Sequence, residues 1–239
     1  MKNSNLKQSI GIIGGMGPQA SAKLLEVLIA ICNRDYGAKD DSDFPEIILN
    51  SIPVPDFISD GTNINPAFNT LQDRIKRLES FNPICFGIAC NTAHLLLEDL
   101  QVKTKVPFTS IIEEVTKKVV ESQINKVGLL VTPVTISSDL YQDALEEQGI
   151  GVIIPSKGEQ EIVDEVIRNI LAGKIDKADR QKLIIVAKSL EKRDTQGIIL
   201  GCTELSLIFP KKISLPIFDS IEILARALLK KFFEEKRIN

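Results

Sequence analysis

Two short segments of the sequence carry a cysteine in a setting that favours acid–base or nucleophilic chemistry, residues 87–94 and 200–205. In each segment an apolar run typical of a strand leads to a cysteine, Cys90 or Cys202, and small polar residues and a helical periodicity follow. A thiol at the N-terminus of a helix lies where the helix dipole stabilises the thiolate. The two matched thiols predict two half-sites that face one pocket.

The number of candidate bases limits what two thiols can do. A hydrolase pairs its nucleophile with a separate base, and the single histidine, His94, cannot serve both cysteines. Two equivalent thiols instead suit a reaction that removes a proton from one face of a stereocentre and returns a proton to the other face. Preorganised donors must then stabilise the carbanion beside the substrate carboxylate. The backbone N–H groups after each cysteine, together with Asn91, Thr92 and Thr203, are the candidates.

Each cysteine and the histidine also have a structural interpretation. Free cysteines are commonly buried in protein cores, but the matched positions of Cys90 and Cys202 favour a function. Cys85 lies at an odd offset from Cys90 in the same strand and should point into the core, and Cys32 lies on the apolar face of a helix. His94 could orient Cys90 or act as a poor metal ligand. Because the chain has no second histidine, we favour a hydrogen-bonded structural role and predict no metal site.

Strands and helices alternate along the chain, and the second half repeats the first. Strands are predicted at 10–13, 47–49, 84–89, 106–112 and 128–133, and helices at 20–32, 66–80, 92–100, 113–122 and 221–235. The pattern predicts an α/β fold with two similar doubly wound parallel-sheet domains, related by pseudo-twofold symmetry, and an active site at their interface. We expect residues 1–106 to form the first domain, 107–216 the second, and 217–239 to complete the first.

A glycine-rich turn follows the first strand, with glycines at 11, 14, 15 and 17 before Pro18. The strict order of a dinucleotide-binding fingerprint is absent, and the next strand ends at Leu49 and Asn50 without an acidic residue. We therefore expect no nucleotide cofactor here. A small anionic group near the N-terminus of the following helix fits the turn better.

Composition excludes several classes of protein. The chain has 239 residues, 26% of them charged, and a net charge of −3, which makes nucleic acid an unsuitable partner. The apolar runs are too short to cross a membrane, and the polar N-terminal residues are followed almost at once by glycines, which argues against a signal peptide. Four cysteines without a CxxC pair indicate reduced thiols rather than disulfides. We expect a cytoplasmic protein.

Three motifs, in this order and spacing, resemble the aspartate/glutamate racemase family, and most closely its aspartate racemase branch: GGMGP at 14–18, ACNTAH at 89–94 and GCTE at 201–204. The resemblance covers essentially the whole chain. It implies racemisation of a small amino-acid substrate without pyridoxal phosphate or another cofactor, and usually a homodimer. It also implies that Cys90 and Cys202 are the catalytic acid and base. The residues expected to line the substrate are Met16, Gly17, Phe57, Asn91, Thr92, Thr132, Leu171 and Thr203.

Two of these positions depart from the family pattern in a way that bears on the substrate. Typical aspartate racemases hold the substrate's side-chain carboxylate with an arginine at the position of Phe57 and a lysine at the position of Leu171. Apolar residues there would deprive that carboxylate of charge-assisted hydrogen bonds, worth roughly 1.5–3 kcal/mol each. We therefore expect a preference for neutral or apolar side chains, unless Lys174 reaches into the site. Val134 and Leu224 also depart from the family pattern, without a mechanistic explanation at this stage.

Two alternatives to an amino-acid racemase remain. One is another carbon-acid isomerase of the same superfamily, acting for example on hydantoins or maleate. The other is a non-catalytic amino-acid-binding protein, which would have no need to retain both Cys90 and Cys202.

Overall fold

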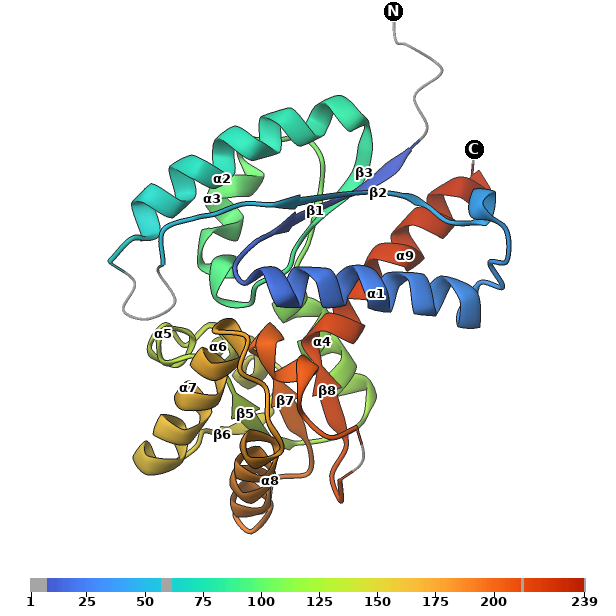
Figure 1. The fold of residues 1–239 in the computed structure, drawn as a ribbon. Helices are drawn as coiled ribbons and strands as arrows, with labels where there is room; N and C mark the ends of the chain where they lie inside the picture. Colours follow the sequence, from blue (N-terminus) through green and yellow to red (C-terminus); the bar gives the residue numbers. More distant parts are fainter. Residues whose placement is uncertain (1–7, 57–61, 212, 239) are drawn as a thin grey trace, which may run out of the picture.

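The computed structural model describes residues 8–56, 62–211 and 213–238, and its helices flank two separate parallel sheets (Figure 1). The first part of the chain contains β1 (Ser9–Gly14), α1 (Pro18–Asp35), β2 (Glu46–Ser51), α2 (Ile64–Leu78), β3 (Pro83–Ile88), α3 (Leu97–Gln101) and β4 (Phe108–Thr109). The second contains α4 (Ile111–Glu121), β5 (Lys126–Leu130), α5 (Pro133–Ser137), α6 (Leu140–Glu146), β6 (Gly151–Ile153), α7 (Lys157–Leu171), α8 (Lys177–Glu191), β7 (Ile198–Leu200), β8 (Ile217–Asp219) and α9 (Ser220–Ile238).

The two sheets have equivalent strand orders. The first sheet runs β2-β1-β3-β4 and the second runs β6-β5-β7-β8, with every pair parallel. In each sheet the earliest strand of its half therefore lies between the second and third strands. The predicted α/β class and the duplication are confirmed. β3, which precedes Cys90, therefore occupies the same place in the first sheet as β7, which precedes Cys202, occupies in the second.

Local sequence explains how the first strand and helix form. All six residues of β1 are buried, and Ile10 lies between Ile47 of β2 and Cys85 of β3. Gly17 precedes α1 with an extended backbone, and Pro18 is the first helical residue, where its lack of an N–H has no cost. Leu24 and Leu28 then lie on the face of α1 that is fully buried. The strand and helix thereby hold the glycine turn between them in a fixed place.

Helix α9 joins the two halves of the molecule. It packs against α1 and β3 on one side and against α4 on another (Figure 1). Leu24 of α1, Leu129 of β5 and Leu228 of α9 belong to one buried apolar cluster. Leu224, one of the departures from the family pattern, is fully buried in this same cluster. Its apolar side chain thus contributes to the core that runs between the sheets.

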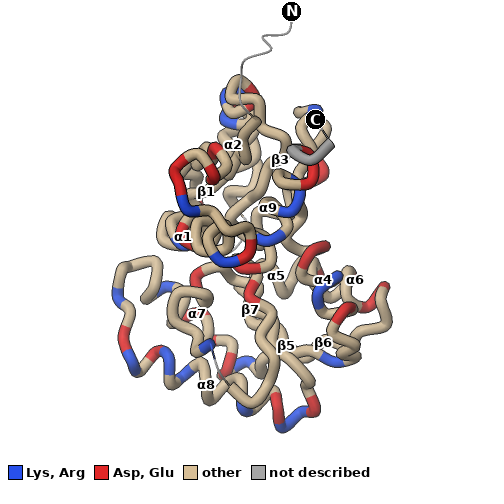
Figure 2. The backbone as a smooth tube through the Cα atoms, turned by 90° about the vertical axis from the view of Figure 1, so that its right-hand side faces the viewer, with Lys and Arg blue, Asp and Glu red and all other residues tan. Residues whose placement is uncertain are grey.

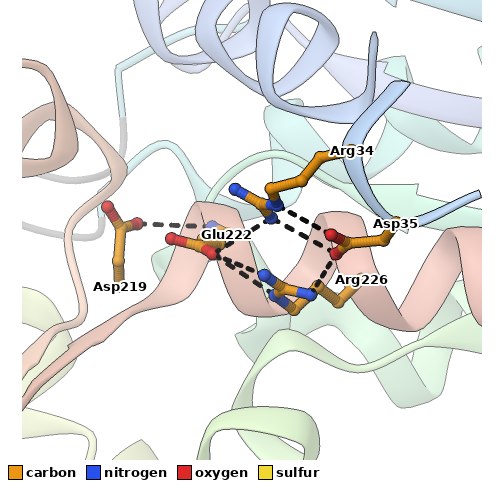
Figure 3. Close-up of polar contacts among 5 residues, drawn as sticks. All are labelled: Arg34, Asp35, Asp219, Glu222 and Arg226. Atoms are coloured by element: carbon orange, nitrogen blue, oxygen red, sulfur yellow. Dashed lines mark hydrogen bonds and ion pairs between the residues drawn. The ribbon is translucent and has the colours of Figure 1, made fainter. Parts of the chain in front are cut away.

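Charged side chains add a surface contact between α1 and α9 (Figure 3). Arg226 of α9 donates to Asp35 at the end of α1 over 2.7 Å, and Arg34 lies 3.9 Å from Glu222. Asp219 accepts the backbone N–H groups at the start of α9. Solvent-exposed pairs of this kind contribute little to stability. Figure 2 shows both signs of charge interspersed over the outer helices, in keeping with the small net charge.

The strands at the ends of the two sheets bear on the expected domain boundaries. β4 at Phe108–Thr109 pairs with β3 in the first sheet, although we expected residue 107 to begin the second domain. β8 at Ile217–Asp219 pairs with β7 in the second sheet, although we expected 217–239 to return to the first. We therefore propose that the crossings between domains lie after Thr109 and after Asp219. The strand predicted at 106–112 is also shorter, because Ser110 caps α4 through the N–H of Glu113.

Candidate active site

Both thiols lie just beyond the carboxyl ends of equivalent strands. β3 ends at Ile88 and β7 at Leu200, so each cysteine follows its strand by two residues, and a short 3-10 helix comes next. Cys90 is 4% exposed and Cys202 is 5% exposed. The two line a single cavity between the halves of the molecule. Its lining residues are Met16, Cys90, Asn91, Thr92, Thr132, Cys202, Thr203 and Glu204.

Five of the expected substrate-lining residues therefore meet at the thiols, and two others lie beside the cavity. Gly17 and Leu171 contact one another beside the cavity: a Cβ atom at Gly17 would lie 2.5 Å from Leu171 Cδ2. Phe57 lies outside the described residues. Lys174 is exposed and is absent from the lining of the cavity, while Val134 is the second residue of the short helix α5 and is half-buried.

The cavity is almost closed. Its free volume of about 10 Å³ is about enough for one water molecule. An amino acid cannot fit into that space without movement of the lining. We refer to this conformation, in which the cavity is too small for a substrate, as closed.

Glu204 also lines the cavity, although the sequence analysis did not select it. Its side chain is 2% exposed, and its Oε2 accepts hydrogen bonds from Cys202 Sγ over 3.0 Å and from Thr203 Oγ1 over 3.1 Å. Its Oε1 accepts the backbone N–H of Gly17 over 3.1 Å. The sequence contained one sign of this contact. Glu204 is an acidic residue in the first turn after Cys202, next to the strand end where the pocket is expected. The backbone of the glycine turn thus donates a hydrogen bond to a carboxylate of the protein itself.

Burial keeps both thiols protonated, contrary to the expectation from the helix dipole. Burial raises the pKa of Cys90 to about 12, with a further rise from the Glu204 carboxylate. Hydrogen bonds from Ala93 and Thr92 lower that pKa but only in part. Burial also raises the pKa of Cys202 well above its ordinary value, and the charge and hydrogen bond of Glu204 raise it further. Desolvation outweighs the dipole because both cysteines are buried, so a thiolate there would lose most of its solvation by water.

Three threonine hydroxyls join the halves of the molecule next to the thiols. Thr92 Oγ1 lies 3.2 Å from Thr132 Oγ1 and 2.9 Å from Thr135 Oγ1, and the latter two lie 3.0 Å apart. Thr92 follows β3, whereas Thr132 and Thr135 follow β5. This hydroxyl triangle can donate to a substrate group only by giving up one of its own hydrogen bonds.

Asn91 makes a second polar connection across the interface. Its Oδ1 accepts the hydroxyl of Tyr141 in α6 over 2.6 Å, and its Nδ2 donates to Ser220 Oγ at the start of α9 over 3.1 Å. All three side chains are buried. Asn91 is therefore held in one orientation beside Cys90, which is the preorganisation that a charge-stabilising donor requires.

The histidine and the other cysteines have structural roles, as the sequence indicated. His94 Nε2 accepts the N–H of Ile111 over 3.0 Å, so its Nδ1 carries the proton and donates to the carbonyl of Cys90 over 2.9 Å. Burial lowers the pKa of His94 to about 4 and keeps it neutral. Cys32 and Cys85 lie in the apolar core, and burial raises the pKa of each to about 11. Among the described residues no cluster of three or more potential metal ligands occurs.

Comparison with known proteins places this geometry in a family of enzymes. The Asp/Glu/Hydantoin racemase family matches residues 13–228, and the chain belongs to it. It is 27% identical over 227 residues to the broad specificity amino-acid racemase RacX of Bacillus subtilis, covering 93% of this chain and 97% of RacX. The fold resembles the Picrophilus torridus aspartate racemase with a TM-score of 0.80 and 32% identity, over 94% of this chain and 93% of that one.

A second solved structure agrees with this assignment. An aspartate racemase homologue from Pyrococcus horikoshii superimposes with a TM-score of 0.78 and 32% identity, over 93% of this chain and 97% of that one. The chain is thus a racemase of this family. In the part of the chain that the structure describes, no helix is long and apolar enough to span a membrane.

Proposed function

We propose that this racemase inverts the Cα of amino acids without a cofactor, and that Cys90 and Cys202 exchange the Cα proton from opposite faces. The observation that carries the proposal is the shared cavity, which both thiols line from equivalent strand ends of two like sheets. A racemase with two bases needs one of them deprotonated and the other protonated when the substrate is in place. Both thiols are protonated in the closed conformation, so one proton must first be removed.

Glu204 is the group positioned to accept that proton. Its Oε2 lies 3.0 Å from Cys202 Sγ, within the range for direct proton transfer. Transfer to the carboxylate leaves a Cys202 thiolate, which takes the Cα proton of the substrate. The Cys90 thiol then gives its proton to the opposite face of the carbanion and remains as a thiolate. That thiolate is stabilised by the Thr92 and Ala93 N–H groups. It serves the reverse direction, and proton exchange with solvent resets the pair when the site opens.

The carboxylate of the substrate must be held while the carbanion forms. Asn91, Thr92 and Thr203 supply polar hydrogens at the cavity wall, and the Asn91 amide is already oriented by Tyr141 and Ser220. Closure of the two halves would exclude water and strengthen these hydrogen bonds.

The proposed preference is for side chains without negative charge. Leu171 packs its side chain against Gly17, so an apolar group occupies the position where a cation would hold a carboxylate. Lys174 is exposed and does not line the cysteine cavity. An aspartate side chain would lose the charge-assisted hydrogen bonds that a cation at position 171 would supply, at roughly 1.5–3 kcal/mol each.

Exchange of the Cα proton in D2O tests the proposal. The purified protein is incubated with L- and D-amino acids without added cofactor, and deuterium incorporation and chirality are followed together. We expect exchange with inversion for alanine, leucine or methionine, faster than for aspartate. Cys90→Ala and Cys202→Ala should each abolish racemisation, and Cys32→Ala, which removes a thiol far from the cavity, serves as the matched control.

The outcomes separate the alternatives. Full activity of either active-site variant would refute the two-base scheme. Faster racemisation of aspartate would refute the substrate preference alone. If no amino acid exchanges, a hydantoin- or maleate-type isomerase or an amino-acid-binding protein becomes the better hypothesis.

Two further expectations accompany the function. Catalytic thiols must stay reduced, which is consistent with the cytoplasm. The homodimer expected from the family can be tested by light scattering after size-exclusion chromatography, where twice the mass of 26.4 kDa is the predicted result.

A further inference from the structure

The short 3-10 helix Thr203–Leu207, which follows the second thiol, is connected to other parts of the molecule by two side chains. It has only five residues, and 3-10 segments have poorer internal hydrogen-bond geometry than α-helices. Glu204 connects it to the glycine turn before α1. Ser206 connects it to β8, because its hydroxyl donates to Asp219 Oδ1 over 2.6 Å. The segment that carries the proposed proton acceptor is therefore held from two sides.

Asp219 is fixed by further contacts. It is the last residue of β8, which pairs with β7 in the second sheet. Its Oδ1 also accepts the backbone N–H of Ile221 over 3.0 Å, and Figure 3 shows its contact with Glu222 at the start of α9, where it accepts a second N–H. A carboxylate that accepts N–H groups in this position caps the helix. The Ser206 hydroxyl is therefore bonded to a rigid acceptor.

Ser220, the residue after Asp219, contacts the other half-site. Its Oγ accepts the side-chain amide of Asn91 over 3.1 Å, and Asn91 directly follows Cys90. Ser220 is fully buried, so this hydrogen bond is protected from water. Two adjacent residues at the start of α9 therefore contact the segments that follow both thiols.

We propose that the start of α9 holds the two half-sites in register, and that Asp219 is the positioning residue for the second one. Asp219 acts through Ser206 on the Glu204 carboxylate. Direct proton transfer depends on the 3.0 Å separation between that carboxylate and Cys202 Sγ, and a displacement of about 1 Å can lower a rate about 100-fold. This inference rests on the proposed racemase function. It goes further, because neither Asp219 nor Ser206 lines the cysteine cavity.

A double-mutant cycle tests the path from Asp219 to Glu204. Ser206→Ala removes the connecting hydroxyl and leaves Asp219 as the cap of α9. For the fastest of L-alanine, L-leucine, L-methionine and L-aspartate, we expect kcat to fall about tenfold and KM to change less than threefold. In a Glu204→Gln background the same change should lower kcat less than twofold, because the group that it positions is already absent. Ser80→Ala is the matched control, since it removes a surface hydroxyl that donates over 2.7 Å to the Arg77 carbonyl.

The contact of Ser220 with Asn91 should give the opposite pattern. Ser220→Ala frees the Asn91 amide, which belongs to the half-site of the first thiol. Its effect on kcat, about tenfold, should therefore be equally large in the wild-type and Glu204→Gln backgrounds. Circular dichroism verifies that each variant is folded, and long incubation in D2O measures the residual exchange of the slow ones.

The outcomes distinguish positioning from a merely structural role. An unchanged kcat in Ser206→Ala would overturn the role of Asp219, and so would an equal drop in both backgrounds or in Ser80→Ala. Full activity of Ser220→Ala would overturn the register of the two half-sites. Either result in an active wild type leaves the racemase function intact, whereas a wild type that racemises none of the four amino acids would overturn both.

Discussion

His94 makes the stability of this protein depend on pH in a way that can be calculated. Its ring is buried, and both of its nitrogens are engaged with the backbone, one with Cys90 and the other with Ile111. Burial lowers its pKa from the ordinary 6.5 to about 4 in the folded protein. The unfolded chain therefore binds a proton at a higher pH than the folded chain does. The contribution of His94 to the free energy of unfolding is fully present above the pKa of the residue in the unfolded chain. It is lost as the pH falls toward the pKa of the residue in the folded protein.

The magnitude follows from the two pKa values. Between about pH 7 and pH 5 the loss from His94 amounts to about 2 kcal/mol, and the full difference approaches about 3 kcal/mol near pH 4. Urea unfolding at both pH values measures the total change. The variant His94→Asn isolates the histidine, because the asparagine amide can still donate to the Cys90 carbonyl but does not titrate. The wild type should lose about 2 kcal/mol more than the variant on acidification.

Direct titration of the ring provides an independent measurement. The chain has one histidine, so its ring resonances in an NMR spectrum are unambiguous. A pKa close to 6.5 in the folded protein would refute the calculation, and so would equal acid sensitivity of the wild type and the variant.

Three further predictions concern catalysis. Glu204→Gln should lower kcat roughly 100-fold or more, because the carboxylate that accepts the Cys202 proton is gone. Polarimetry measures the rate of racemisation, and a decrease in kcat of less than threefold would remove Glu204 from the mechanism. Leu171→Lys should raise kcat/KM for aspartate relative to leucine by roughly tenfold or more; an unchanged ratio would mean that this position does not face the substrate. Gly17→Ala should inactivate the enzyme while leaving it folded, since the new Cβ would lie 2.5 Å from Leu171 Cδ2 and 3.2 Å from Glu204 Oε1; circular dichroism and the racemisation assay together check this, and normal activity would contradict it.

The fold and the meeting of the thiols could be predicted because both depend on periodicity. Two patterns can be seen in the sequence without knowing which residues are close in space. They are the alternation of strands and helices and the matched positions of Cys90 and Cys202. Parallel strands bring such positions to the same edge of a sheet. The core positions of Cys32 and Cys85 followed from the same patterns.

The parts that could not be predicted depend on how the two halves pack. The sequence gives no measure of desolvation, so the thiolate expected from the helix dipole is replaced by a protonated, buried thiol at Cys90. The contact of Glu204 with Gly17 joins residues from opposite halves of the chain, and no local pattern reports it. The pairing of β4 with β3 and of β8 with β7 could not be predicted either, because strands of two or three residues carry too little sequence pattern to assign them to one sheet or the other.

Helix α9 and helix α4 have a mechanical consequence for the closed cavity. In the described ranges the chain leaves the first sheet after β4 and enters α4, and it leaves the second sheet after β8 and enters α9, which packs back on β3 of the first sheet. These two helices pack against one another, so both covalent connections lie close together. Two adjacent connections leave the halves free to turn about the line that joins them but resist sliding. We therefore expect the site to open by rotation about a single hinge axis, with the hydroxyl triangle among the contacts that separate.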